Sequence, residues 1–186
     1  GALYHDVGKL HAPNWFIENQ DGSKNPHDEI DNPFRSAEVL QAHVDEGLHY
    51  ARKNRLPKPI ANFIPEHQGT LKMGYFFQKA KEKNLKINEN DFRYKGPIPQ
   101  SKETAILMLA DGCEAALRAM NINASDNEAL ETISRIIYSR KKDGQLDDSN
   151  LSKGEIFLIK RAFLNVWKRI RHRRIQYPTT KNNTFS

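Results

Sequence analysis

The sequence has a single cysteine, Cys113, and no apolar run long enough to cross a bilayer. One cysteine excludes an internal disulfide and fits a reducing compartment. The longest apolar runs, such as AILMLA at residues 105–110, are far shorter than the ~20 residues that a membrane helix needs. The opening stretch GALYHDVGKLHAPN also lacks the charged and apolar regions of a signal peptide. We therefore expect a soluble chain.

The sequence does have an ordinary globular composition with an excess of positive charge. Of its 186 residues, 38% are hydrophobic and 28% are charged, which is enough for one domain with a buried core. The net charge of +6 favours anionic partners such as phosphates, nucleic acid or lipid headgroups. Much of the excess lies in KRIRHRRIQ, residues 168–176. This stretch is either the solvated end of a helix or a tail lying near an anionic membrane surface.

Apolar residues at helical spacing dominate the chain, and no segment alternates with a period of two. Capping boxes at Ser125/Glu128 and Ser152/Glu155 predict the start of two helices. Three more helices are predicted from spacing alone, at residues 33–54, 57–67 and 101–120, with Pro65 kinking or ending the second. The predicted fold class is therefore all-α. Long irregular stretches at residues 10–32 and 87–100 are expected to be functional loops.

Three polar residues occupy positions where the helical pattern predicts an apolar side chain. His43 lies on the apolar stripe of the 33–54 helix, and His67 continues the apolar face of the next segment. Asp111 is in the middle of the most hydrophobic predicted helix. A buried carboxylate needs a cation or strong hydrogen-bond donors, and a buried histidine needs partners for both ring nitrogens. A divalent metal would satisfy all three.

Each of these residues also has an ordinary explanation when taken alone. A single inward histidine is more often a hydrogen-bonded core residue, and a buried aspartate often caps a neighbouring helix. Together with the adjacent pair His5 and Asp6, however, they form a set on separate segments, which is typical of metal ligands pointing into a helical bundle. The remaining histidines His11, His49 and His172 lack this placement and are expected on the surface.

Long motifs in this chain resemble a known family. They are ALYHDVGK, ENQDGSKNPHDEI, EHQGT, FRYKGPIPQSKETAILMLADGCEAALR, DGQLDDSNLS and HRRIQYP. HDVGK is similar to the signature of the HD superfamily of metal-dependent phosphohydrolases. The order of all six motifs resembles the cytoplasmic HD domain of the seven-transmembrane HD proteins, which are membrane-anchored bacterial phosphodiesterases acting on cyclic di-AMP.

The resemblance implies an HD-domain helical bundle with a centre of two divalent metal ions, iron or manganese, that hydrolyses cyclic di-AMP to the linear dinucleotide pApA. Carried over by position, His5, Asp6 and Asp111 would hold one metal, and Asp6 would bridge to a second metal held by His43 and His67. Lys9 would offset phosphate charge, although it is equally compatible with a solvated lysine. The implied partner is a dinucleotide and not a nucleic-acid polymer.

Two departures from the family pattern are visible. Family members carry a further ligand histidine on a helix before the ALYHD segment, so the domain is expected to span residues 1–178 without that part, followed by a disordered tail at 179–186. The family also often shows two consecutive histidines where this chain has His67 and Gln68. An amide oxygen is a poorer ligand than an imidazole for a borderline metal.

Substrate contacts are predicted at four further positions, each of which is also compatible with a solvated loop residue. His27 and Asp28 lie in the long loop before the His43 helix, where they could face the phosphates. Arg93 and Lys102 flank the entry to the Asp111 helix and could pair with a phosphodiester.

The family context places this soluble chain at the cytoplasmic face of the cell membrane, anchored by a transmembrane region outside it, with a basic C-terminal helix that could touch anionic lipid. Two other functions stay open. One is an HD phosphohydrolase acting on another nucleotide. The other is a non-catalytic module that binds a nucleotide without turning it over.

Overall fold

The computed structural model describes residues 1–20, 24–121 and 123–174, so the tail predicted at 179–186 lies outside the described residues. Within these ranges the chain is helical and contains no strand, and an isolated antiparallel bridge joins Lys72 to Arg93. The all-α prediction is confirmed. The elements in chain order are η1 (Val7–His11), η2 (Pro13–Trp15), η3 (Ile17–Asn19), α1 (Pro26–Ile30), α2 (Pro33–Lys53), α3 (Lys58–Ala61), α4 (Phe63–Glu66), α5 (Gly74–Glu82), η4 (Glu89–Phe92), α6 (Lys102–Arg118), α7 (Asp126–Lys142) and α8 (Lys153–Arg174).

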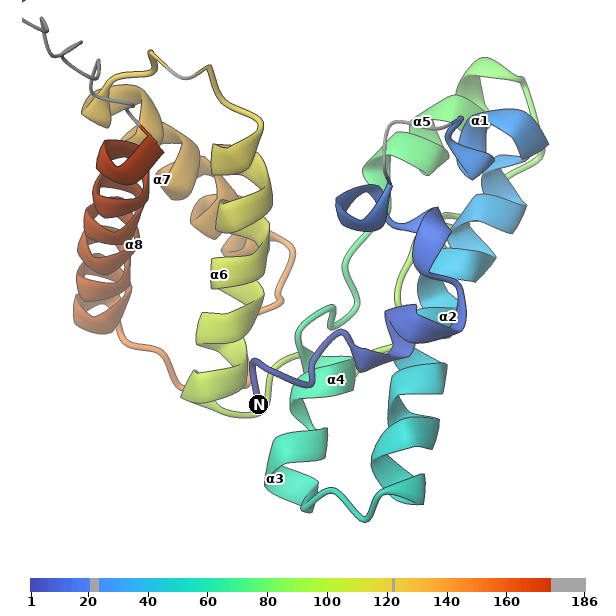
Figure 1. The fold of residues 1–186 in the computed structure, drawn as a ribbon, viewed down its shortest axis with the longest axis horizontal. Helices are drawn as coiled ribbons and strands as arrows, with labels where there is room; N and C mark the ends of the chain where they lie inside the picture. The colour runs from blue at the N-terminus through green and yellow to red at the C-terminus, as the bar shows by residue number, and fades with distance from the viewer. Residues whose placement is uncertain (21–23, 122, 175–186) are drawn as a thin grey trace, which may run out of the picture.

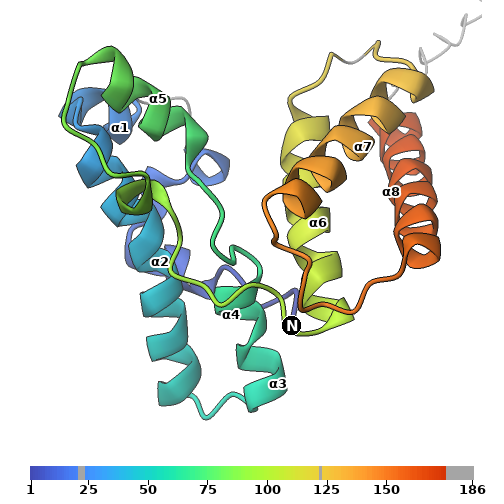
Figure 2. The same ribbon diagram turned by 180° about the vertical axis from the view of Figure 1, so that it is seen from behind.

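The helices form two groups, which Figures 1 and 2 show from opposite sides. The long helix α2 anchors one group, together with α1, α3, α4 and α5, while α6, α7 and α8 form the other. Each group has its own apolar core. Buried members of the first include Ala37, Phe76 and Phe92, and buried members of the second include Leu109 and Ile133. Burying a large apolar side chain contributes roughly 1.5–3 kcal/mol to stability, so each group is stabilised by its own core.

The helix boundaries follow the expected caps. Ser125 and Glu128 form the full capping box at the start of α7. The helix predicted at 57–67 is interrupted at Asn62 instead of at Pro65, because the chain forms the two short helices α3 and α4 there. Pro65 lies in the first turn of α4, where its missing N–H costs no intrahelical hydrogen bond.

The short helix η1 packs closely against α2, and Gly8 makes this possible. A side-chain carbon at Gly8 would overlap the carbonyl oxygen of His43 and crowd the backbone nitrogen of Gly47. Gly8 is the only buried residue of η1. The glycine of the HDVGK motif thus lets the segment that carries His5 and Asp6 lie directly beside His43.

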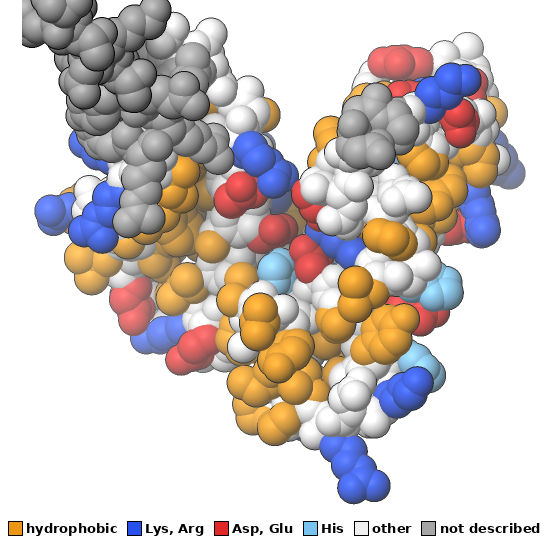
Figure 3. Space-filling model, in the orientation of Figure 1, with side chains coloured by type: hydrophobic (Ala, Val, Ile, Leu, Met, Phe, Trp, Pro, Cys, Tyr) orange, Lys and Arg blue, Asp and Glu red, His pale blue; other side chains and the backbone are white. Residues whose placement is uncertain are grey.

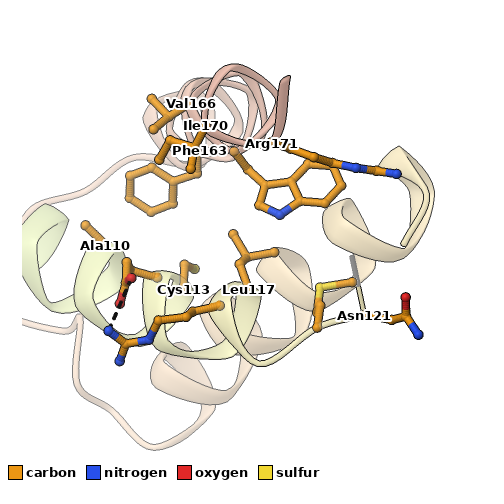
Figure 4. A pocket seen from close by; sticks show the side chains of 12 residues that line it. Ala110, Cys113, Leu117, Asn121, Phe163, Val166, Ile170 and Arg171 are labelled. Carbon is orange, nitrogen blue, oxygen red and sulfur yellow. Dashed lines mark ion pairs between the residues drawn. The ribbon is translucent and has the colours of Figure 1, made fainter. Parts of the chain in front are cut away.

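An apolar pocket of about 600 Å³ lies between α6 and α8 (Figure 4). Its lining includes Leu117, Phe163 and Trp167, and the ion pair between Glu114 and Arg118 is at its edge. The candidate metal ligands are not among its lining residues. Within the described ranges, no helix is both long and apolar enough to cross a membrane.

Glu66 connects the two groups of helices. It is 3% exposed, and its Oε2 atom accepts hydrogen bonds from the Thr104 hydroxyl at 2.6 Å and from the Gln100 N–H at 2.9 Å. Thr104 is in the first turn of α6, so this carboxylate ties the end of α4 to the start of α6. The connection fixes where His67 lies relative to the helix that carries Asp111.

We expect Glu66→Ala to lower the free energy of unfolding by about 2–3 kcal/mol, because two buried donors lose a charged acceptor. Urea denaturation with a chelator present measures this effect apart from metal binding. Glu131→Gln, at an exposed position of α7, is the matched control and should change stability by less than about 0.5 kcal/mol. An equally small effect of Glu66→Ala would show that the connection does not stabilise the fold.

Candidate metal centre

The Asp6 carboxylate is the centre around which the predicted ligands gather. Its Oδ2 atom lies 3.1 Å from Nε2 of His5, and its Oδ1 atom lies 3.3 Å from Nε2 of His67 and 3.6 Å from Nε2 of His43. His5 and Asp6 come from the start of the chain, His43 from the middle of α2, and His67 from the end of α4. Segments far apart in sequence therefore meet at one carboxylate.

All three histidines present the same ring nitrogen to Asp6. In His5, His43 and His67, the Nδ1 atom lies 2.5 to 2.6 Å from the backbone carbonyl oxygen three residues earlier. A carbonyl only accepts hydrogen bonds, so Nδ1 carries the proton and donates it. In the neutral ring, Nε2 is then left with an unprotonated lone pair. Such a backbone bond commonly orients a metal-ligating histidine.

The inward-facing atoms lack hydrogen-bond partners. Nε2 of His5, Nε2 of His43 and Oδ1 of Asp6 are each buried without one among the described residues. Neutral imidazole lone pairs that face a carboxylate at 3 to 4 Å repel it unless a proton or a metal ion lies between them. Burying polar atoms in this way is costly, and a cation removes the cost. The donor set of imidazole nitrogens and a carboxylate therefore fits a divalent transition metal.

The ligand atoms also span the right distances for an ion. Ligand atoms of His5, Asp6 and His67 all lie within 4.8 Å of one another. The Oδ1 atom of Asp111 lies 3.9 Å from Nε2 of His5. The ring centroid of His43 lies 5.6 Å from that of His67. The arrangement is compatible with the two predicted ligand groups that share Asp6, and the assignment of each ligand stays a prediction.

The environments of these residues differ in part from expectation. The side chains of His43 and His67 are 2% and 0% exposed, as their positions on apolar faces predict. The expectation that Asp111 is buried was wrong, because its side chain is 40% exposed. Helix α6 borders the notch between the two helix groups. Figure 3 shows acidic, basic and histidine side chains together in this notch. Asp111 therefore faces an accessible part of the centre.

Protonation states in the centre suit metal binding. Desolvation by burial, followed by the charge of His67, lowers the pKa of His43 to about 4, so this imidazole is neutral at physiological pH. Burial acts to raise the pKa of Asp6, but contacts with His5 and His67 and the charge of Lys9 lower it overall. The centre thus offers a neutral nitrogen ligand and an ionised carboxylate, the forms that metals bind.

Lys9 lies at the edge of the centre, in contact with two carboxylates. Its Nζ atom is 2.6 Å from Oδ2 of Asp6 and also pairs with Glu18 on η3. The Lys9 side chain is 18% exposed. The sequence analysis did not identify Glu18, which lies in the long irregular stretch where no helical pattern marks it. Lys9 is positioned to act on charge at Asp6, and its predicted catalytic role stays a prediction.

The predicted substrate contacts His27 and Asp28 lie on α1, where they have other partners. His27 is buried between the rings of Trp15 and Phe76 at centroid distances of 5.0 and 4.9 Å, and its Nε2 atom donates to the Trp15 carbonyl. Asp28 is 3.6 Å from the ammonium of Lys79. No contact in the described structure joins either residue to the Asp6 group, and their predicted role is not tested.

Arg93 and Lys102 also have partners of their own. Arg93 pairs with Glu89 at 2.7 Å and with Asp143 at 3.0 Å, while Lys102 pairs with Glu155 at 2.6 Å. Arg93 therefore connects η4 to the loop after α7, and Lys102 connects the starts of α6 and α8. Their predicted contact with a phosphodiester likewise stays a prediction.

Tyr94 is a residue of the centre that the sequence analysis missed. Its ring contacts the ring of His43 edge-on, with centroids 5.9 Å apart. Burial, and then the negative charges of Asp6, Asp111 and Glu18, raise the pKa of its phenol, which stays protonated. Neighbouring side chains of an extended segment point to opposite sides. The contact of Tyr94 with His43 is thus consistent with Arg93 pairing with Glu89 and Asp143 on the opposite side of the segment.

Gln68 approaches one of the ligand atoms. Its side-chain nitrogen lies 2.9 Å from Nε2 of His67, so the amide donates to the lone pair that a metal would use. Binding of an ion at His67 therefore requires this amide to turn away or to present its oxygen to the ion. Gln68 would thus adjoin the coordination shell of an ion held by His67.

Comparison with known proteins agrees with the motif resemblance. A family model described as HD domain matches residues 1–116. The chain is 48% identical over 183 residues to uncharacterized protein slr0104 of Synechocystis sp. (strain ATCC 27184 / PCC 6803 / Kazusa), covering 96% of this chain and 22% of that protein. It is 39% identical over 178 residues to the cyclic-di-AMP phosphodiesterase PgpH of Bacillus subtilis (strain 168), covering 96% of this chain and 25% of that protein.

A solved structure is similar over nearly the whole chain. The crystal structure of the L. monocytogenes phosphodiesterase PgpH HD domain in complex with cyclic-di-AMP superposes with a TM-score of 0.86 at 36% identity, covering 90% of this chain and 78% of that one. The chain spans only about a quarter of the length of the curated relatives it matches. The similarity therefore concerns one domain of longer proteins.

We expect Asp6→Asn to remove bound metal, because an amide loses the charge that offsets the ion and cannot bridge two ions as a carboxylate does. Elemental analysis after loading with Mn²⁺ or Fe²⁺ measures the metal-to-protein ratio. Asp28→Asn, at an exposed position of α1, should retain the ratio of the parent chain. Full metal content in Asp6→Asn would contradict the proposed centre.

Replacing Gln68 by histidine should shift metal preference. The Gln68→His imidazole adds a nitrogen ligand beside His67 and removes the amide that donates to its lone pair, so affinity for Fe²⁺ or Co²⁺ should rise by at least about 10-fold relative to Mn²⁺. Competitive metal titration measures the ratio of affinities. An unchanged ratio would place Gln68 outside the coordination shell.

Proposed function

The chain belongs to the HD domain family, and we propose that it is a metal-dependent phosphodiesterase that hydrolyses cyclic di-AMP to the linear dinucleotide pApA. The general class, an HD phosphohydrolase, follows from the family. The proposal that cyclic di-AMP is the substrate is supported by two relatives named cyclic-di-AMP phosphodiesterase, at 39% and 38% identity. It is also supported by a similar HD domain solved in complex with cyclic-di-AMP.

The observation that best supports the proposal is the set of buried, unpartnered atoms around Asp6. Nε2 of His5, Nε2 of His43 and Oδ1 of Asp6 converge without hydrogen-bond partners in the described structure, although each is costly to bury. A structural histidine cluster would satisfy these atoms within the protein. An unsatisfied cluster is instead expected where ligand ions complete it.

We propose two ions, iron or manganese, with His5, Asp6 and Asp111 holding one and His43 and His67 holding the other across Asp6. When bound, such a pair lowers the pKa of a bridging water and stabilises charge on a phosphate. The protein contributes the fixed orientation of the rings through their Nδ1 hydrogen bonds and the ionised state of Asp6.

Other residues would act on the substrate directly. Lys9 already adjoins Asp6 at 2.6 Å and brings positive charge to the edge of the centre, which would offset phosphate charge. The Tyr94 ring contacts that of His43 and its phenol stays protonated, so we propose that its hydroxyl donates a hydrogen bond to a phosphate oxygen. Both residues hold a proton where negative charge develops during phosphodiester hydrolysis.

We further propose that this domain works at the cytoplasmic face of the cell membrane, anchored through a transmembrane region outside this chain. The helix α8 would lie near anionic lipid through cations such as Arg161 and Arg169, which are exposed. Each basic residue close to such a surface contributes about 1 kcal/mol of attraction.

Supplied with Mn²⁺ or Fe²⁺ without oxygen, the chain should convert cyclic di-AMP to pApA, as followed by reversed-phase chromatography. His43→Ala should lower the rate by more than about 100-fold, because it removes a ligand that is almost fully buried. His49→Ala, at an exposed position of the same helix, is the control and should leave the rate unchanged.

A panel of other substrates distinguishes the alternatives. Faster turnover of another cyclic dinucleotide or of a nucleoside phosphate would replace the proposed substrate within the same enzyme class. Tight binding of cyclic di-AMP without any turnover, in the presence of either metal, would favour a binding module and refute the proposed activity.

A further inference from the structure

Arg140, in the last turn of α7, is a half-buried cation without a partner in the described part of the chain. Its guanidinium forms no hydrogen bond or ion pair there, and its Nε atom is buried and unpaired. Burial works against the charged form, and arginine cannot escape this cost by losing its proton. A charge held in this way normally has an anion to meet.

Helix α6 makes room for this guanidinium directly after Asp111. A Cβ atom at Gly112 would lie 3.1 Å from Nη2 of Arg140 and 3.3 Å from Cγ2 of Ile136, both closer than an ordinary contact. Glycine is disfavoured inside a helix. Its presence here keeps the guanidinium against the α6 backbone, beside the residue that we assign to the metal centre.

The end of α7 is fastened near the other side of the centre as well. The Arg140 carbonyl accepts a hydrogen bond from the Gln145 N–H at 3.0 Å. The Gln145 side chain in turn accepts from the Thr70 N–H at 3.0 Å and donates to the Thr70 hydroxyl at 2.8 Å. Thr70 follows His67 by one turn of chain. Arg140 is therefore held between the segment after His67 and the turn of α6 that carries Asp111.

The nearby acids do not neutralise Arg140. The charge of Asp143 acts on Arg140, but both carboxylate oxygens of Asp143 pair with Arg93, at 3.1 and 3.0 Å. Asp111 acts on Arg140 through its charge but forms no ion pair with it in the described structure, and it is a proposed metal ligand. Bound metal ions would add positive charge at this edge of the centre, which a substrate anion could offset.

From this placement we propose that Arg140 binds a non-bridging oxygen of the substrate phosphodiester at the α6 edge of the metal centre. The inference rests on the proposed function, since it requires a phosphodiester substrate. A guanidinium suits this role because its planar N–H groups match the oxygens of a phosphate. Arg140 would then act on affinity for the substrate and not on retention of the metal.

The test compares Arg140→Gln and Arg140→Lys with Arg135→Gln, an exposed arginine on the same helix. Calorimetry with a phosphorothioate analogue of cyclic di-AMP and Mn²⁺ gives binding, and steady-state hydrolysis of cyclic di-AMP gives KM and kcat. We expect Arg140→Gln to weaken binding and raise KM by about 10- to 100-fold, with metal content unchanged. Arg140→Lys should recover part of the loss, and Arg135→Gln should match the parent chain.

Two results would overturn the assignment to Arg140. One is that Arg140→Gln binds the analogue with the affinity of the parent chain. The other is that Arg140→Gln loses bound metal to the same extent as it loses the analogue, which would mean that Arg140 supports Asp111. If Arg140→Gln does not fold, Gly112→Ala takes its place, because it displaces the guanidinium and keeps its charge. Gly112→Ala should also raise KM, and an unchanged KM would count against the proposal.

Hydrolysis of bis(p-nitrophenyl) phosphate separates this inference from the proposed function. If the chain cleaves that diester and not cyclic di-AMP, the substrate assignment fails, and the same Arg140 comparison on the chromogenic diester still decides the role of Arg140. If it neither binds nor cleaves any phosphodiester with either metal, both proposals fall.

Discussion

The structure depends on the meeting of several imidazole nitrogens at one half-buried carboxylate, that of Asp6. The Nε2 atoms of His5, His43 and His67 face Asp6 at 3.1 to 3.6 Å, and their other ring nitrogens are committed to backbone carbonyls. The rings cannot relieve the repulsion by turning without breaking those hydrogen bonds. Close packing of η1 on α2 at Gly8 keeps the backbone of this segment beside His43. A proton or a cation between these atoms would stabilise the arrangement, and the Gln68 amide donates to Nε2 of His67.

Local patterns in the sequence predicted most of the helices and the residues that meet at the centre. His43 and His67 were identifiable because a polar residue on an apolar helical face is a local anomaly, visible from spacing alone. The capping box at Ser125 and Glu128 is also a local pattern, and it marks the start of α7 in the structure. The assignment of ligands to individual metals came from the family resemblance and has no counterpart in local spacing.

What the sequence could not predict depends on contacts between distant segments. The ion pairs of Arg93 with Glu89 and Asp143 could not be predicted, because no periodicity indicates a partner in another segment. The exposure of Asp111 could not be predicted either, because helical spacing shows only that its helix is apolar. Tyr94 was overlooked because an extended segment without helical period gives no sign of which face is inward.

The connection through Glu66 lies beside the centre and has a mechanical consequence. Asp6, His43 and His67 belong to the first helix group, whereas Asp111 belongs to the second. An ion shared between Asp6 and Asp111 would add a further connection between the two helix groups, beside the Glu66 hydrogen bonds, the Arg93–Asp143 ion pair and the Thr70–Gln145 hydrogen bonds. A metal ion that joins residues so far apart in the sequence restricts the motion of the two helix groups relative to each other. Metal binding would thus make the domain more rigid as a whole.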